Sequence, residues 1–347
     1  MKPSRIILLT LLSTTTLLFN RCSTNFDLTS EWKDITIVYG LLNFADSAIY
    51  VKVNKAFLDK KNNALVQAQI PDSIYYNNIN VTLSEYNSSG VLTNTFNMIR
   101  VDGNEEGYIK ESGTFPQSPN YLYKVKYSPK TDRTYKVIVN KGDGNASSAS
   151  TPIVGDIVVI RPTPAIPTAM LPGNTGGIIA SWKAPKNAKF YDLTIRINYI
   201  EFPNGQQQDS VQKSFEWKAF DEYIPDLPDA GITIEYKIFT QTMYDLMAQY
   251  IPANPNITRK IRPADFIFAA GATDLYTYLQ VVKAKEGITQ GIIQPDYTNV
   301  TNGIGLFTSR SFKSSQAVLK PSTIDSIACN KMTKALRFLN SQGMLCP

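Results

Sequence analysis

Residues 177–199, GIIASWKAPKNAKFYDLTIRINY, decide the fold of this chain. Two apolar runs with the alternation of β-strands flank the turn sequence APKN. Leu193, Ile195 and Ile197 fall on one face of the second run, because successive side chains of a strand point to opposite sides. Trp182, in the first run, is a large apolar side chain that can pack against this face from a second sheet. The stretch therefore predicts two strands that pack across a β-sandwich.

The same stretch resembles the B and C strands of a fibronectin type III or immunoglobulin-like domain. The resemblance rests on residues 178–182, the APKN turn and the alternating strand that Tyr191 begins. It implies a core built around Trp182 without a disulfide. A sugar-stacking platform is the alternative role for Trp182.

Short alternating runs recur on both sides of this stretch and predict a mainly β protein. They cover residues 35–39, 49–53, 81–83, 91–98, 121–127, 134–139, 155–160, 211–217 and 233–240. The turn sequence NSSG at 87–90 predicts a β-hairpin. Helical spacing appears only at 243–250, 273–287 and 323–340, and we expect these stripes to pack against the sandwiches. The fold class is two immunoglobulin- or fibronectin-III-like β-sandwich domains followed by a C-terminal region with two helices.

Composition places the boundaries between these parts. Pro162, Pro164 and Pro167 stiffen the chain after the strand predicted at 155–160. We expect a signal peptide at 1–21, a lipid-anchored tether at 22–30, an N-terminal sandwich at 31–161, a fibronectin-III-like sandwich at 162–260 and a helical region with a Gly/Asn/Tyr-rich segment at 261–347.

The first 21 residues have the pattern of a secretory leader. Lys2 and Arg5 precede an apolar run at 6–19, which is shorter than the roughly 20 residues that a membrane-spanning helix needs. Cys22 then stands where bacterial lipoproteins carry their acylated cysteine, so we expect lipid on Cys22 and attachment to the outer membrane, on either its periplasmic or its outer face. Arg21 occupies a position that is usually small, and the alternative is an ordinary leader with an incidental Cys22.

Charge and cysteine content exclude several classes of function. Removing the leader takes away Lys2, Arg5 and Arg21 and no acid, so the net charge falls from +6 to 6 − 3 = +3, too small to indicate nucleic acid as a partner. Cys329 and Cys346 form a disulfide in an oxidising compartment or stay as two buried thiols, and the sequence leaves both open. No CxxC cluster is present, so we expect no metal site and no cofactor.

The chain contains no histidine, which removes Ser-His and Cys-His nucleophiles and histidine-ligated metals. The adjacent acids at 105–106 and 221–222 would point to opposite faces of a strand, so neither pair alone places two carboxyls across a bond. No nucleophile elbow, SxxK motif or phosphate loop is present. We therefore expect a protein that is not an enzyme, with a histidine-free hydrolase as the least favoured alternative.

Residues 290–310, QGIIQPDYTNVTNGIGLFTSR, are the most distinctive segment. Gly303 and Gly305 permit a positive φ or close backbone approach, which predicts a tight turn or a docking segment rather than a phosphate cradle. The candidate interaction residues are Tyr297, Asn299, Asn302, Gly303, Gly305, Phe307 and Arg310.

Together with VYGLLN at 38–43, DSIYY at 72–76 and AST at 149–151, this segment resembles a family of Bacteroidota cell-envelope lipoproteins of unknown function. Members are often encoded beside TonB-dependent transporters. The resemblance implies an integral outer-membrane protein as partner and assigns no catalytic residue.

Four tripeptides fit the Asp-Ser-aliphatic acceptor pattern of Bacteroidota O-glycosylation, at Ser47, Ser73, Ser210 and Ser326. Each also fits an ordinary turn that leads into a strand, because Asp and Ser bond back to the local backbone.

These observations predict a lipid-anchored outer-membrane protein that acts as a non-catalytic binding or scaffolding subunit of an envelope complex for transport, secretion or gliding. The alternative is a surface glycan-binding lipoprotein that uses exposed Trp32, Trp217 or loop tyrosines. A buried Trp217 would remove the main platform of that alternative.

Overall fold

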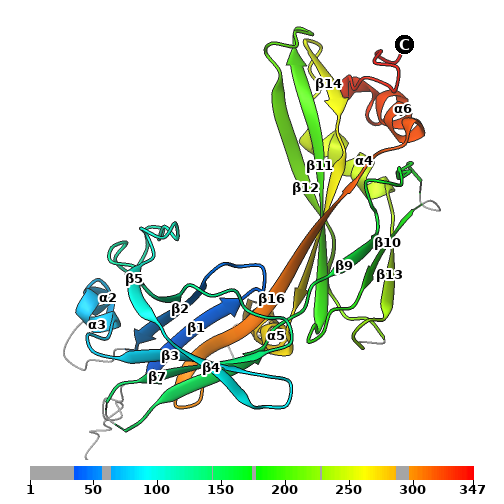
Figure 1. The fold of residues 1–347 in the computed structure, drawn as a ribbon. Helices are drawn as coiled ribbons and strands as arrows, with labels where there is room; N and C mark the ends of the chain where they lie inside the picture. Colours follow the sequence, from blue (N-terminus) through cyan, green and yellow to red (C-terminus); the bar gives the residue numbers. More distant parts are fainter. Residues whose placement is uncertain (1–34, 57–63, 143, 174–176, 227–228, 287–296) are drawn as a thin grey trace, which may run out of the picture.

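The computed structural model describes residues 35–56, 64–142, 144–173, 177–226, 229–286 and 297–347. The protein is mainly β, as predicted, and its strands form two sandwich-like lobes (Figure 1). Cys22 and Trp32 lie outside the described residues.

A nine-stranded sheet runs through both lobes. Its strand order is β12-β11-β15-β16-β1-β2-β6-β5, with β14 paired to β11. These strands are β1 (Thr36–Leu42), β2 (Ile49–Lys55), β5 (Ile99–Asp102), β6 (Tyr121–Val125), β11 (Phe190–Pro203), β12 (Val211–Tyr223), β14 (Ile257–Ile261), β15 (Ala264–Gly271) and β16 (Gly303–Ala317).

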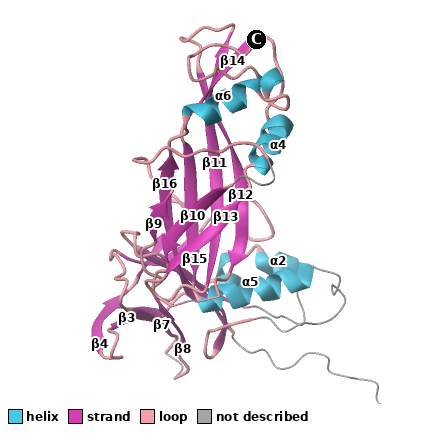
Figure 2. Ribbon diagram, turned by 90° about the vertical axis from the view of Figure 1, so that its right-hand side faces the viewer, coloured by secondary structure: helices cyan, strands magenta, loops and turns pink. Residues whose placement is uncertain are grey.

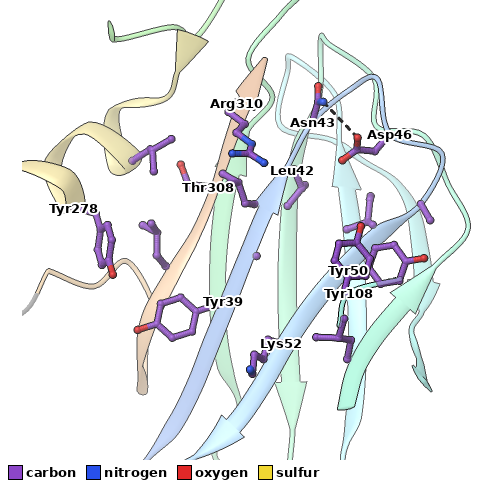
Figure 3. Close-up of a pocket in the computed structure, with 17 residues that line it drawn as sticks. Tyr39, Leu42, Asn43, Asp46, Tyr50, Lys52, Tyr108, Tyr278, Thr308 and Arg310 are labelled. Carbon is purple, nitrogen blue, oxygen red and sulfur yellow. Dashed lines mark hydrogen bonds between the residues drawn. The ribbon is translucent and has the colours of Figure 1, made fainter. Parts of the chain in front are cut away.

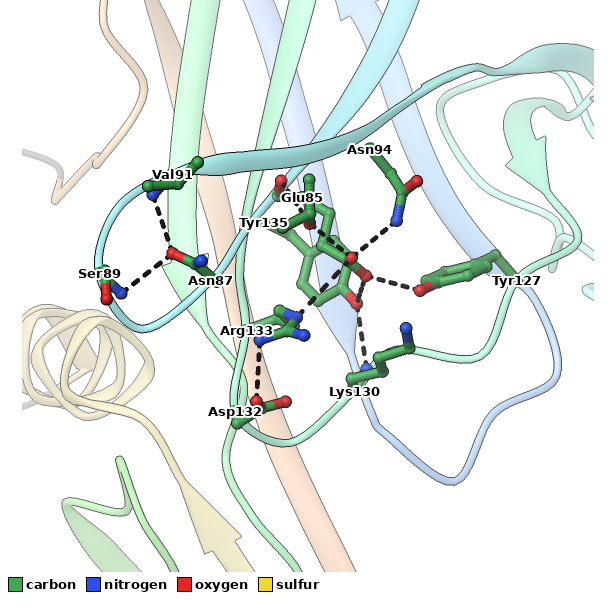
Figure 4. A network of polar contacts seen from close by, with 11 residues as sticks. Glu85, Asn87, Ser89, Val91, Asn94, Tyr127, Lys130, Asp132, Arg133 and Tyr135 are labelled. Atoms are coloured by element: carbon green, nitrogen blue, oxygen red, sulfur yellow. Dashed lines mark hydrogen bonds and ion pairs between the residues drawn. The ribbon is translucent and has the colours of Figure 1, made fainter.

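Two smaller sheets provide the facing layers. The sheet β4-β3-β7-β8 belongs to the first lobe, and β13-β10-β9 belongs to the second. Their strands are β3 (Asn80–Tyr86), β4 (Leu92–Asn97), β7 (Thr134–Asn140), β8 (Ser147–Pro152), β9 (Val158–Arg161), β10 (Ile178–Lys183) and β13 (Thr233–Ile238). β3 and β4 form the predicted hairpin, where the Asn87 side-chain oxygen accepts hydrogen bonds from the backbone N–H groups of Ser89 and Val91 (Figure 4).

The second core is built around Trp182, as the sequence predicts. Its indole is fully buried, and the rings of Tyr191 and Phe268 lie 5.3 and 5.4 Å from it, measured between centroids. Leu193, Ile195 and Ile197 of β11 face the same core.

The strand β16 belongs to both lobes. Its first half pairs parallel with β1, from Thr36↔Gly303 to Leu42↔Ser309, and its second half pairs antiparallel with β15 up to Ala264↔Ala317. In Figure 1 it runs as one orange ribbon from one lobe into the other. A single strand near the end of the chain therefore completes both halves of the large sheet.

The prediction of a helical region at 261–347 is wrong in this respect, because the strands β15 and β16 both lie there. The strand β16 contains many Ser and Thr residues, so it lacks the apolar alternation that predicts a strand. Its partner β1 lies far away in sequence and gives no local signal of the pairing. The boundary at 260/261 falls inside β14. The boundary at 161/162 is also too late, since Ile153 packs in the first core and Val154 already packs in the second.

Helices cover the ends of the sheets. The predictions at 243–250 and 273–287 are confirmed by α4 (Gln241–Tyr250) and α5 (Thr273–Glu286). The helix predicted at 323–340 is too long. The helix α6 (Pro321–Cys329) ends at Cys329, because the backbone is extended at Asn330, and only the 3-10 turn η1 (Lys334–Leu336) follows. The sequence did not predict two short helices, α2 (Ala64–Ala68) and α3 (Pro71–Ile74), which lie beside the first lobe in Figure 1; Figure 2 labels α2 from the side. Within the described residues, none of the helices is long and apolar enough to span a bilayer.

Candidate functional site

A groove of about 460 Å³ lies on the outer face of the large sheet, over β2, β1 and β16 and beside α5 (Figure 3). The strand β1 builds its floor by alternation: Val38 and Leu42 point into the first core, whereas Tyr39 and Leu41 point outward and are 44% and 39% exposed. The alternation that folds the lobe therefore also leaves an apolar stripe on its surface.

Tyrosines form the walls of this groove. Tyr50 of β2 packs against Tyr108, with ring centroids 4.8 Å apart, and donates a hydrogen bond to Glu106 at 2.9 Å. Burial and the Glu106 carboxylate together raise the pKa of Tyr50, so its hydroxyl stays protonated. Tyr278 reaches the opposite wall from α5.

Two cations face the groove without an ion-pair partner within the described part of the chain. Lys52 is half-buried between these walls, and burial lowers its pKa. Arg310 lies at the other end of the groove, with its guanidinium 4.7 Å from the ring centroid of Phe312. Burial also lowers the pKa of Arg310, and the more distant Asp46 opposes that shift. The groove thus combines aromatic, aliphatic and cationic groups.

The candidate interaction segment is mostly internal structure where it is described, which favours the tight turn over the docking segment among the two alternatives. Asn299 holds the start of β16: its amide group donates to the Phe307 carbonyl at 2.8 Å, and its oxygen accepts the Phe307 N–H at 3.0 Å. Its amide also donates to Asp274, which accepts the Tyr297 hydroxyl as well. Phe307 is fully buried in the first core.

The remaining residues of that segment join β16 to its neighbours. Asn302 adopts a left-handed φ of 54° and accepts a hydrogen bond at its carbonyl from Ser147. A Cβ on Gly303 would lie 2.6 Å from the Thr36 carbonyl oxygen, and one on Gly305 would lie 2.0 Å from that of Val38. The glycines thus permit close approach of β1. Of the candidate residues, Arg310 is the one that lines the groove.

A second polar cluster surrounds Glu85, whose side chain is buried between β3, β4 and β7 (Figure 4). Tyr127 and Tyr135 donate to one carboxylate oxygen at 2.6 and 2.7 Å, and Thr93 and Asn94 donate to the other at 2.7 and 2.9 Å. Burial raises the pKa of Glu85, but these four hydrogen bonds outweigh burial and lower it to about 2. A carboxylate that accepts hydrogen bonds on both oxygens and stays ionised stabilises the fold and is poorly suited to donate a proton.

The acidic pairs singled out in the sequence are engaged by neighbouring side chains. Glu106 is bound by Lys124 and Tyr50, and Lys283 bridges Asp221 and Glu222. Burial, together with the hydrogen-bonded Asp221 carboxyl, raises the pKa of Asp192. The Asp192 and Asp221 carboxyls are thus closer together than the roughly 5 to 9.5 Å that separates the two catalytic carboxyls of glycoside hydrolases. No cluster of metal-ligating acids or cysteines occurs among the described residues.

The tryptophans proposed for glycan stacking are buried where they are described. Trp217 is only 7% exposed, and Trp182 is fully buried. The glycan-binding alternative therefore loses its main platform.

The other predicted positions lie at the periphery. Cys329 and Cys346 form a disulfide with Cα atoms 5.3 Å apart, which resolves the choice between the two states in favour of pairing. Ser47 and Ser210 are exposed in turns, whereas Ser73 and Ser326 lie in α3 and α6.

Comparisons with known proteins add no family. No family model matches the chain, and no curated protein matches it. Trypsin-activated alpha-2-macroglobulin from Escherichia coli is 9% identical with a TM-score of 0.19, over 70% of this chain and 14% of that one. The elastase-activated form from the same organism is 9% identical with a TM-score of 0.18, over 69% and 18%. The structure of CBD12 from CALX1.2 is 7% identical with a TM-score of 0.16, over 80% and 100%. This chain thus spans less than a fifth of the macroglobulin chains, and similarity at this level carries no argument about function.

Proposed function

We propose that this protein is a lipid-anchored outer-membrane lipoprotein that acts as a non-catalytic binding or scaffolding subunit of an envelope complex. The observation that carries the binding role is the groove over β2, β1 and β16, where aromatic and aliphatic side chains lie exposed beside Lys52 and Arg310, two cations without an ion pair among the described residues. Exposed apolar patches rimmed by polar groups are typical of interaction sites.

The envelope location has two further supports. The Cys329–Cys346 disulfide fits an oxidising compartment, such as the periplasm or the cell surface. Cys22 follows a leader-like stretch at the position of an acylated cysteine. The partner that suits such a location is an integral outer-membrane protein of a transport, secretion or gliding complex.

The anchor is tested by labelling cells with palmitate and comparing the full-length wild type with Cys22→Ala. We expect label and membrane retention in the wild type and loss of both in the variant. Equal labelling of the two would contradict the anchor.

The binding role is tested by mild detergent extraction of tagged wild-type protein, followed by identification of bound proteins. We expect an integral outer-membrane protein in stoichiometric amount. A chain that always purifies alone would contradict the role as a complex subunit.

Glycan binding is the second candidate, and one feature favours it. A polar depression of about 410 Å³ lies on the second lobe, where Asp265 accepts hydrogen bonds from Asn198 and Gln316. Such planar polar groups suit sugar hydroxyls. Glycan-array binding that is lost in Asn198→Ala but retained in Lys52→Glu would support this candidate over the groove.

A further inference from the structure

The groove carries a more specific inference, which rests on the proposed function. We infer that it binds an extended acidic segment of the partner polypeptide, with one carboxylate on Lys52, a second on Arg310 and an apolar side chain between them over Leu41.

The strand register sets the spacing of the two cations. Lys52 is paired with Tyr39 across β2 and β1, and Arg310 follows Ser309, which is paired with Leu42 across β16 and β1. The cations are thus about four residues apart along the strands and two strands apart across them. With a rise of about 3.3 Å per residue and a strand spacing of about 4.8 Å, their backbones lie about 16 Å apart on the diagonal.

An extended peptide matches this spacing with acidic residues at positions i and i+4. These two side chains lie on the same side of the peptide about 13 Å apart, and the long side chains of lysine and arginine cover the remaining distance. The side chain at i+2 also faces the groove. The strand register places Leu41 and its neighbour Thr308 below this side chain, between the levels of Lys52 and Arg310.

The charge balance favours carboxylates over cations. Lys52 and Arg310 have no ion pair within the described structure, and Lys110 lies near enough to Lys52 to repel it. Of the acids at the groove, Glu106 is already bound by Lys124 and Tyr50. Asp46 also lines the groove and attracts Arg310 electrostatically, but it accepts a hydrogen bond from Asn43 and makes no ion pair with Arg310 in the described structure. Lys52 is half-buried, so an incoming carboxylate would meet a cation that has already lost part of its hydration, whereas the exposed Arg310 would attract a carboxylate from solvent.

A polypeptide is favoured over an acidic polysaccharide by the groove's surface. Leu41 and Leu306 lie in its floor between the two cations, and these aliphatic side chains suit an apolar side chain of a peptide better than sugar hydroxyls. Alternating acidic and apolar side chains of an extended segment fit this pattern directly.

Direct binding is measured by fluorescence anisotropy, with the full mature chain and a labelled peptide Glu-Ser-Leu-Ser-Glu, against Lys-Ser-Leu-Ser-Lys. We expect binding of the acidic peptide only, and loss of at least about tenfold in affinity in Lys52→Glu/Arg310→Glu. The matched control Lys183→Glu/Lys186→Glu makes the same charge change on exposed residues of the second lobe and should bind like the wild type. The milder pair Lys52→Gln/Arg310→Gln serves if the reversal variant does not show the wild-type circular dichroism spectrum.

Three results would overturn the inference: no binding of the acidic peptide, equal binding by the groove variants, or binding of polygalacturonate in place of the peptide. Detergent co-purification separates this failure from that of the proposed function. A partner retained by both groove variants refutes the acidic segment alone, whereas a wild-type chain without any partner refutes the proposed function itself.

Discussion

Replacing Glu85 with glutamine tests the buried network of the first lobe. The Glu85 carboxylate accepts four hydrogen bonds, two on each oxygen, from Tyr127, Tyr135, Thr93 and Asn94. Glutamine has nearly the same shape but keeps only one acceptor oxygen. Its NH₂ group must then face two donors, which leaves buried polar groups unsatisfied.

The magnitude follows from the pKa of Glu85. Folding lowers this pKa from 4.5 to about 2. At about 1.36 kcal/mol per pKa unit, the ionised carboxylate contributes about 3 kcal/mol to the free energy of unfolding at pH 7. Because the folded pKa is the lower one, this contribution is present above pH 4.5 and is lost as the pH falls toward 2.

Urea denaturation followed by circular dichroism measures the effect. We expect Glu85→Gln to lower the free energy of unfolding by about 3 kcal/mol at pH 7, and the gap to the wild type to narrow as the pH falls below about 4.5. Glu216→Gln is the matched control, because that carboxylate is 54% exposed and pairs with Arg196 at the surface, where a loss below about 1 kcal/mol is expected. Equal losses in the two variants, or a gap that does not change with pH, would refute the reasoning.

Three further variants test the fold. Gly305→Ala would place a Cβ 2.0 Å from a carbonyl oxygen of β1, so we expect thermal unfolding well below that of Gly343→Ala, which has a positive φ but open space. Cys329→Ser/Cys346→Ser should lower stability by about 3 kcal/mol in urea melts, and a reducing agent should then have no further effect on the variant. Arg259→Met should cost about 3 to 5 kcal/mol, since buried Arg259 binds Glu201 and two backbone carbonyls, and Arg259→Lys should fail to restore the wild-type melting temperature.

Local alternation was enough to predict most strands and the lobe around Trp182. The runs that become β10 and β11 carry their own pattern, and α5 shows its spacing within one segment. Such signals depend only on neighbouring residues, so they can be found without knowing the rest of the fold.

The pairing of β16 could not be predicted in this way. Its partner β1 lies at the opposite end of the described chain, and no local period encodes a parallel contact over that separation. The sequence did mark both segments as distinctive, at 38–43 and 290–310, and the structure places β1 and β16 side by side. Gly303 and Gly305 let the two backbones approach closely, which is one of the two roles that the sequence indicated for them.

The candidate groove was only partly accessible from the sequence. Arg310 was named, but Lys52 and Tyr39 become neighbours only through strand register. Glu85 carried a signal that the sequence analysis missed: it continues the inward positions of Val81 and Leu83, where an acid requires dedicated partners.

The geometry of β1 and β16 also has a mechanical consequence. The two strands run parallel, with the chain entering β1 at its first residue and leaving β16 at its last. If a membrane anchor holds the N-terminal end while a partner pulls on the second lobe, the two strands are drawn in opposite directions along their axes. The backbone hydrogen bonds of the paired residues, from Thr36↔Gly303 to Leu42↔Ser309, would then be loaded at the same time instead of breaking one after another. Under that load, the pairing that completes the first lobe would also resist separation of its strands.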